Sequence, residues 1–178
     1  MDSINKNQSE SNHKNLIADK AIEKIQELIN KAKTCFFCTE VAAGPSEGCR
    51  PMGVEKVDSN GHLWFLSAAD SHKNEEITEN PNVKLYFQGS THSDFLYLTG
   101  KAKITKDKNK INELWDSTHK TWFTEGKDDP RISVIEVIPE EGYYWDTKHG
   151  NFVAGIKIMI GAALGKTMDD SIEGKVLV

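Results

Sequence analysis

The sequence lacks an excess of positive charge and any long apolar run. It has 22 lysine and arginine residues against 27 aspartate and glutamate residues, which gives a net charge of -5 and a pI near 5.7. Binding to a phosphate backbone needs a basic face, so nucleic acid is not an expected partner, although one lysine can still hold one phosphate.

Residues 1–15 contain no apolar run, so we expect no signal peptide. No stretch approaches the roughly 20 apolar residues of a membrane span. We therefore expect a cytoplasmic protein with no membrane partner.

Cysteine is also scarce. Cys35 and Cys38 have the C-x-x-C spacing, and Cys49 is the third cysteine. A zinc site needs a second matching pair of ligands, which the sequence does not contain, so we predict no metal site. A thioredoxin-like pair lies at the N-terminus of a helix, whereas these residues lie in a strand-like stretch, where positions i and i+3 face opposite sides. We predict ordinary buried cysteines on strands.

The length of 178 residues suits one domain with a substantial core. Residues 1–15 are polar and are predicted to be a disordered tail, which leaves 16–178 as a single domain. Apolar residues recur at helical spacing over 17–32, which predicts an amphipathic helix.

Strands dominate the rest of the chain. We predict them at 34–41, 49–58, 62–68, 83–89, 95–105, 131–139, 142–146 and 173–178, with a hairpin turn at 59–61. Further helices are predicted at 107–120 and 152–164, and a short one from near Ser71 to Asn80. Many strands joined by hairpins, with few helices, predict a mainly β fold, an antiparallel barrel with flanking helices.

The stretch Ser71-His72-Lys73 lies where the short helix is predicted to begin. The first amides of a helix have no partner inside it and, with the helix dipole, favour an anion. One interpretation is a capped helix, with Asp70 or Ser71 as N-cap and Lys73 on the solvated side. The other is that the Ser71 hydroxyl, the amides and the Lys73 ammonium together bind a phosphate.

Two further features point in the same direction without requiring it. Arg50 is either a surface charge or a bidentate phosphate ligand. Pro51 follows it and has no N–H, so this part of the strand is expected at an edge or a bulge. Trp64, Trp115, Trp122 and Trp145 are many for this length, and most are expected in the core or at an interface.

The segments "RPM" at 50–52, "LWFLSAADSHK" at 63–73 and "NPNVKLYFQ" at 80–88 resemble the pyridoxamine 5′-phosphate oxidase-like flavoproteins. The stretches at 97–123, 128–140 and 143–146 resemble the general stress protein branch of that family. The resemblance runs from about residue 16 to the C-terminus. It implies an antiparallel split β-barrel that binds FMN, and a homodimer with the flavin at the subunit interface.

The resemblance also assigns roles to individual residues. Arg50, Ser71 and Lys73 match the positions that contact the FMN phosphate, and Trp145 resembles a tryptophan that reaches the flavin from the partner subunit. The remaining matched positions lie along the flavin ring and the ribityl chain: Pro51, Met52, Phe65, Leu66 and Ser67.

Two departures limit what the resemblance implies about activity. His72 stands where the oxidases carry an arginine, which removes part of a positive charge at neutral pH. The segment after Trp145 also lacks the arginine and histidine pair that grips pyridoxamine phosphate, because His149 lies too close to Trp145 to match it. We therefore expect no pyridoxamine phosphate oxidase activity.

Three hypotheses about function remain open. The first is an FMN-dependent oxidoreductase with an unknown small-molecule electron donor or acceptor, and the second is a flavin-binding or flavin-storage stress protein that catalyses nothing specific. The third is a barrel that binds another cofactor, such as a deazaflavin or haem, and FAD remains an alternative to FMN. No catalytic side chain is predicted. His72 and His119 are candidate proton donors, but the favoured interpretation places both on the solvated surface.

Overall fold

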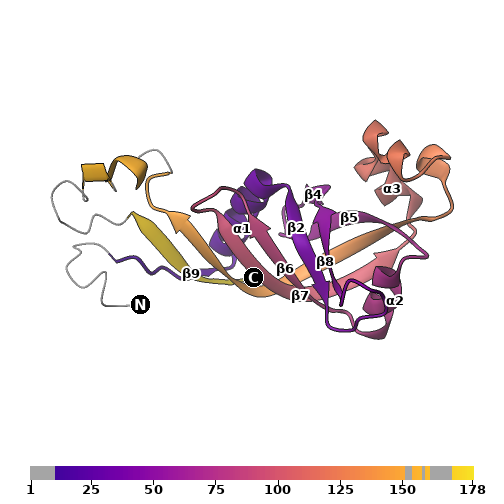
Figure 1. The fold of residues 1–178 in the computed structure, drawn as a ribbon, viewed down its shortest axis with the longest axis horizontal. Coiled ribbons are helices and arrows are strands. Elements are labelled where there is room, and N and C mark those ends of the chain that lie inside the picture. The colour runs from indigo at the N-terminus through magenta and orange to yellow at the C-terminus, as the bar shows by residue number, and fades with distance from the viewer. Residues whose placement is uncertain (1–10, 151–153, 158, 161–169) are drawn as a thin grey trace.

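The computed structural model describes residues 11–150, 154–157, 159–160 and 170–178. Its framework is a long, curved sheet with helices packed against it (Figure 1). The strands are β1 (Leu16–Ile17), β2 (Thr34–Thr39), β3 (Cys49–Gly53), β4 (Lys56–Val57), β5 (Leu63–Ala68), β6 (Asn82–Gln88), β7 (Phe95–Thr105), β8 (Ile132–Thr147) and β9 (Ser171–Leu177). The helices are α1 (Asp19–Ala32), α2 (His72–Glu79) and α3 (Lys108–Leu114), with 3-10 turns η1 (Ser117–Thr121) and η2 (Gly126–Asp128). The prediction of a mainly β fold with flanking helices is confirmed.

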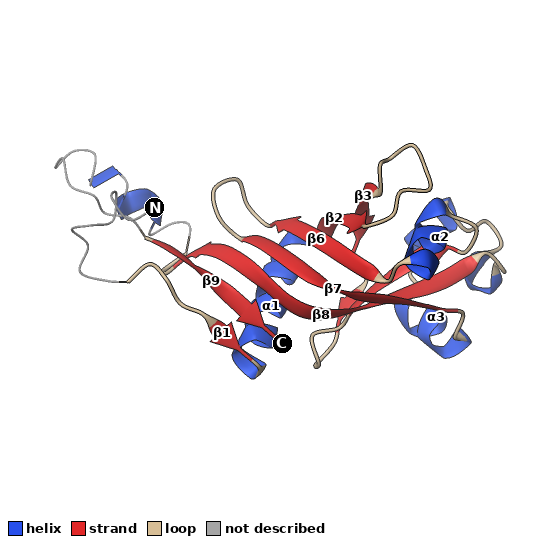
Figure 2. Cartoon of the chain, turned by 90° about the horizontal axis from the view of Figure 1, so that it is seen from below, coloured by secondary structure: helices blue, strands red, loops and turns tan. Residues whose placement is uncertain are grey.

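The sheet is organised around β8, which is 16 residues long and pairs with β7 along its length. The first part of β8, Ile132 to Val137, also pairs with β5, and the last part, Glu141 to Thr147, pairs with β9. The sheet therefore forks along β8, with β4 at the end of one branch and β1 at the end of the other. Figure 2 shows the two ends: α2 and α3 lie at one, β1 and β9 towards the other.

A β-bulge divides the two halves of β8. Thr99 pairs with Glu141 and Gly100 pairs with Pro139, so Glu140 falls outside the register with β7. The strands pass closely here, because a Cβ added at Gly100 would lie 2.3 Å from the carbonyl oxygen of Ile138. The prediction of two strands at 131–139 and 142–146 is wrong, since the bulge keeps the chain paired with β7 across Pro139.

The first and last described strands, β1 and β9, pair at one edge of the sheet. β1 lies parallel to β9, so the sheet is mixed and the prediction of a purely antiparallel arrangement is corrected at this edge. The Lys14 amide donates to the carbonyl of Glu173 at 2.8 Å, so pairing with β9 begins before the predicted tail boundary at residue 15. Residues 1–10 of that tail lie outside the described residues, as does most of the predicted helix at 152–164, of which 154–157 and 159–160 are helical.

The segment from β3 to β4 crosses between two other strands. Its first part pairs with β2. The Val54 amide then donates to Lys33 and the Glu55 amide donates to Trp64, both at 2.9 Å, before β4 pairs with β5. This crossing places Pro51 to Glu55 along one side of a cavity that Lys73 of α2 also lines.

The main core lies between α1 and the sheet. Ala21, Ile25, Leu28 and Ile29 recur at the predicted helical spacing and are fully or almost fully buried. Beneath them, the rings of Phe37 and Phe65 meet edge to face with their centroids 5.4 Å apart. A second, smaller cluster of Ile111, Leu114, Phe123, Ile132 and Val134 fixes α3 and η1 over the start of β8.

The predicted helix at 107–120 is broken at Asp116. Asp116 has an extended backbone, and its carboxylate accepts from the Thr118 amide at 2.9 Å. The side chain of His119 accepts from the Asp116 amide at 2.8 Å, which completes a capping box. The capping box therefore ends α3 and starts η1, which positions His119 towards the sheet.

The cysteines depart from the prediction in one respect. Cys35 is buried and free, as predicted. Cys38 and Cys49 lie directly opposite each other on β2 and β3 and form a disulfide, so the prediction of ordinary buried cysteines is wrong for this pair. The partner of Cys38 is set by the register of the two strands and not by the C-x-x-C spacing.

Candidate functional site

A cavity of about 720 Å³ opens between the crossing segment, the end of β5, the start of α2 and η1. Several residues predicted from the sequence line it: Pro51, Met52, Leu66, Ser67 and Lys73. The fold brings them together because the β3–β4 crossing and the end of β5 run beside each other, and α2 begins directly after β5. The opposite wall contains Asp116, Thr118, His119 and Trp122.

Lys73 supplies the positive charge of this cavity. Burial, together with the nearby charge of Arg50, lowers the pKa of Lys73 to about 8, while the Glu76 carboxylate opposes this shift. Its ammonium donates to the Ser71 hydroxyl over a long 3.3 Å. A partly buried ammonium that has one long hydrogen bond within the described residues fits an anionic ligand, which would restore the stabilisation lost with water.

Ser71 occupies the N-cap position of α2, but its hydroxyl does not cap the helix. It lies 3.3 Å from the Ser67 hydroxyl and 3.3 Å from the Asn74 side-chain oxygen. Asn74 is buried and donates to the Ser133 hydroxyl at 2.9 Å, while Ser67 donates to Asn74 at 2.9 Å. This network holds the start of α2 against β5 and β8, and sequence reasoning missed Asn74 and Ser133.

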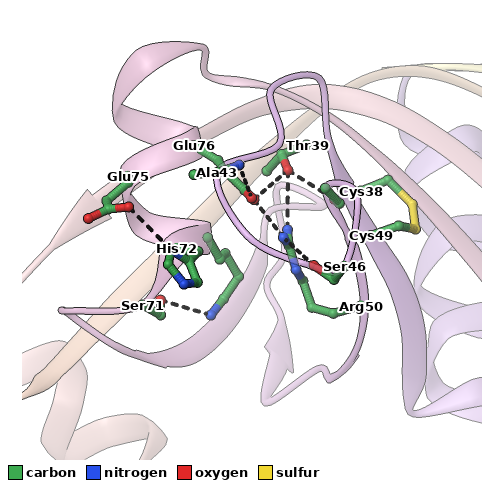
Figure 3. Close-up of polar contacts among 12 residues, drawn as sticks. Cys38, Thr39, Ala43, Ser46, Cys49, Arg50, Ser71, His72, Glu75 and Glu76 are labelled. Atoms are coloured by element: carbon green, nitrogen blue, oxygen red, sulfur yellow. Dashed lines mark hydrogen bonds and ion pairs between the residues drawn. A yellow bond between two sulfur atoms is a disulfide. The ribbon is translucent and has the colours of Figure 1, made fainter.

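Arg50 lies beside the cavity and binds a carboxylate of the same chain. Its guanidinium is 2.6 Å from the carboxylate of Glu76, which is fully buried on α2, and 3.1 Å from the Ser46 hydroxyl (Figure 3). Thr39 and the Ala43 amide also bind this carboxylate, at 2.7 and 2.9 Å. Burial opposes ionisation, but these hydrogen bonds and Arg50 together hold the pKa of Glu76 below its ordinary value.

Two predicted residues lie elsewhere. The side chain of Phe65 points into the core against Phe37 and does not line the cavity. Trp145 lines a second cavity of about 640 Å³, together with Phe36, Tyr86 and Tyr97. Pro51 lines both cavities, so the two adjoin at β3.

The opposite wall holds a histidine–carboxylate pair that sequence reasoning missed. His119 is 7% exposed, so its prediction as a solvated residue is wrong, whereas His72 is exposed as predicted. The Nδ1 atom of His119 accepts from the Asp116 amide, which places the ring proton on Nε2, 3.0 Å from the Glu55 carboxylate. Trp115 packs in the second core cluster, while Trp122 lines the cavity and is 66% exposed.

Within the described ranges, no three or more His, Cys, Asp and Glu side chains are grouped as metal ligands. The helices in the described part of the chain are all too short or too polar to cross a membrane.

Known proteins resemble this chain in sequence and in fold. General stress protein 26 of Bacillus subtilis (strain 168) is 35% identical over 82 residues, which are 44% of this chain and 58% of that protein. The chain therefore spans little more than half the length of this relative.

Solved structures share the fold. A protein from Jannaschia sp. CCS1 assigned to general stress protein 26 superposes with a TM-score of 0.68 at 17% identity, over 88% of this chain and 97% of that one. The general stress FMN/FAD binding protein of Xanthomonas citri superposes with a TM-score of 0.59 at 19% identity, over 68% of this chain and 85% of that one.

The family model described as "Pyridoxamine 5'-phosphate oxidase like" matches residues 20–169, which include both walls of the 720 Å³ cavity. The match covers most of the chain, and the chain therefore belongs to the pyridoxamine 5′-phosphate oxidase-like family, with relatives among the general stress proteins.

Proposed function

We propose that this protein binds FMN in the 720 Å³ cavity, with the phosphate at Lys73 and Ser71. The observation that carries the proposal is the partly buried Lys73 ammonium, which lies near Arg50 and, among the described residues, donates to Ser71 over a long 3.3 Å. The binding of FMN or FAD by the general stress protein of Xanthomonas citri supports it. A flavin with one terminal phosphate suits a cavity that has this one lysine at its edge, whereas FAD would need room beyond the phosphate.

The chain's own residues would hold the cofactor in defined ways. Lys73 and Ser71 would bind the phosphate, and Arg50 would add positive potential while it remains bound to Glu76. The backbone of Pro51 and Met52 and the end of β5 from Phe65 to Ser67 would lie along the ring and the ribityl chain. Bound FMN supplies one- and two-electron redox chemistry, which the protein positions and tunes.

We propose that the sheet functions as a split barrel in a homodimer. The segment 49–57 pairs with β2 through β3 and with β5 through β4. It therefore connects the two sides of the sheet that a barrel has to bring together. Phe36, Tyr86 and Trp145 are exposed together around the second cavity, and a second copy covering them would bury a continuous apolar face. Because Pro51 borders both cavities, this face would place Trp145 of one copy close to the flavin of the other.

An FMN-dependent oxidoreductase is the first candidate activity. A small-molecule electron donor or acceptor would approach between the flavin and the wall formed by Glu55, His119 and Trp122. Pyridoxamine phosphate is not the proposed substrate. His149, the histidine that follows Trp145, binds the buried carboxylate of Asp170 at 2.6 Å.

A flavin-binding protein without a specific reaction is the second candidate. His119 accepts from the Asp116 amide at Nδ1, and its Nε2 proton is directed at the Glu55 carboxylate, which makes it a poor candidate for a proton donor to a bound substrate. A saturable rate of oxidation with one reduced nicotinamide donor would support the enzyme. Equal, slow oxidation of unrelated reductants would support flavin storage.

The direct test is FMN retention. The purified protein is incubated with FMN, desalted and examined by visible absorption, beside the variants Lys73→Met and Lys20→Met. Lys20 is an exposed residue on α1, away from both cavities, and serves as the matched control. Loss of a charge-assisted hydrogen bond costs roughly 1.5–3 kcal/mol, so K73M should bind FMN at least about tenfold more weakly than K20M. A folded wild-type protein that retains no flavin would overturn the proposal.

A further inference from the structure

The disulfide between Cys38 and Cys49 closes the loop of residues 40–48 beside the proposed phosphate site. The two cysteines lie at the end of β2 and the start of β3, and both are half-buried (Figure 3). The disulfide therefore joins the two ends of the loop at a place that a small solute can reach. Neither the family match nor the proposed function assigns a role to it.

The loop contributes directly to the polar contacts of the Glu76 carboxylate and the Arg50 guanidinium. The Ala43 amide donates to the Glu76 carboxylate at 2.9 Å, and the Ser46 hydroxyl lies 3.1 Å from the Arg50 guanidinium. The loop also packs on the first turn of α2, because a Cβ added at Gly44 would lie 2.8 Å from the ring of His72. The position of the loop and that of the start of α2 are therefore linked.

The disulfide is also next to the strand residues that hold Glu76. Thr39 follows Cys38 and lies 2.7 Å from the carboxylate, and Arg50 follows Cys49 and lies 2.6 Å from it. Opening the disulfide would leave these contacts to two strand ends that are joined only through the backbone of the loop and by strand pairing. The position of the Arg50 guanidinium, whose charge acts on Lys73, depends on the same contacts.

We propose that Cys38 and Cys49 form a reversible redox site whose reduction by a small thiol or dithiol loosens the loop of residues 40–48 and weakens anion binding at Lys73. The effect on the anion rests on the proposed flavin function, whereas the redox site and the loop do not. One external thiolate attacks a sulfur of the disulfide and forms a mixed disulfide. A second thiolate then releases the protein thiol, so that two external thiols are oxidised to one disulfide and both cysteines gain a proton.

The third cysteine does not interfere with this exchange. Cys35 is buried on β2, and burial raises the pKa of its thiol to about 12. The thiolate is the attacking species in disulfide exchange, so Cys35 stays out of the reaction at neutral pH. Cys35→Ser is therefore a suitable control.

The test uses the full chain equilibrated with reduced and oxidised glutathione at several ratios. Thiols are trapped with iodoacetamide and located by mass spectrometry, and hydrogen exchange at the Ala43 amide reports on the loop. Titration of thiols at Cys38 and Cys49 together, with faster exchange at Ala43 in the reduced form, is the expected result. Three free thiols in the oxidised protein, or unchanged exchange at Ala43 after reduction, would overturn the proposal.

The link to the anion is measured by FMN titration of both forms. Reduction should raise the Kd for FMN by about threefold to tenfold, the effect of weakening about one hydrogen bond. Cys38→Ser with Cys49→Ser should match the reduced wild type, and Cys35→Ser should respond as the wild type does. If the double variant does not fold, the reduced wild type alone decides. An unchanged Kd after reduction overturns the link, whereas a failure of every form to bind FMN overturns the proposed function and leaves the redox site to the thiol and exchange measurements.

Discussion

If Lys73 binds the phosphate as proposed, the affinity for FMN should depend on pH above neutrality. Burial, together with the charge of Arg50, lowers its pKa in the free protein to about 8, against an ordinary value of 10.5. A phosphate dianion next to the ammonium favours the charged form, so the pKa in the complex lies above 8. Above pH 8 the complex therefore holds more protons than the free protein, and binding weakens as the pH rises through this range.

The size of the effect follows from the two pKa values. If the pKa in the complex returns to its ordinary value, Lys73 at pH 9 is about nine-tenths neutral in the free protein and still charged in the complex. The Kd for FMN should then rise about tenfold between pH 7 and pH 9. Below pH 8 Lys73 is mostly protonated in both states, so the curve is nearly flat down to pH 7, and the phosphate remains largely a dianion there.

The assay is quenching of FMN fluorescence at pH 7, 8 and 9, with riboflavin as a ligand that has the same ring and no phosphate. Riboflavin affinity should change little over this range. Lys73→Met should remove the pH dependence of FMN binding, and Lys20→Met should retain it. A flat curve for FMN with the wild type, or an equal slope for riboflavin, would refute the assignment of Lys73 to the phosphate.

Three further predictions concern stability and assembly. Arg50→Met leaves the buried Glu76 carboxylate without its cation and should lower the free energy of unfolding by about 3–5 kcal/mol, measured by urea denaturation beside Lys20→Met; a loss no larger than that of the control would contradict the pairing. Trp145→Ala should shift the protein from dimer to monomer in sedimentation, and an unchanged dimer would remove this face from the interface. Asp116→Ala removes the cap of η1 and should lower the thermal midpoint of unfolding, and an unaltered midpoint would argue against that cap.

The parts of the fold that depend on short-range pattern could be predicted from the sequence. The helical spacing of Ala21, Ile25 and Leu28 gave α1, and alternation gave most of the strands. Ser71 and Lys73 were recognisable because a helix that begins directly after a strand positions both at its first turn. These features depend on neighbours within a few residues.

The parts that depend on strand register or on distant packing could not be predicted. Cys38 faces Cys49 only because β2 and β3 pair with no offset at that point. Glu76 lies in an acidic helical run and is buried, whereas its neighbour Glu75 is exposed, because Arg50 and the loop of residues 40–48 cover one side of α2. His119 is buried because Glu55, 64 residues earlier in the chain, accepts from it.

The bulge in β8 also decides which way Trp145 faces. Just before it, the odd-numbered residues Ile135, Val137 and Pro139 are buried, and after it the even-numbered residues from Gly142 to Asp146 are buried. The single extra residue at Glu140 shifts the alternation of inward and outward side chains by one. If Glu140 were instead paired in a regular strand, Trp145 would turn inward and Tyr144 outward, so the bulge, and not only the composition of the strand, determines whether an aromatic surface is available to a second molecule.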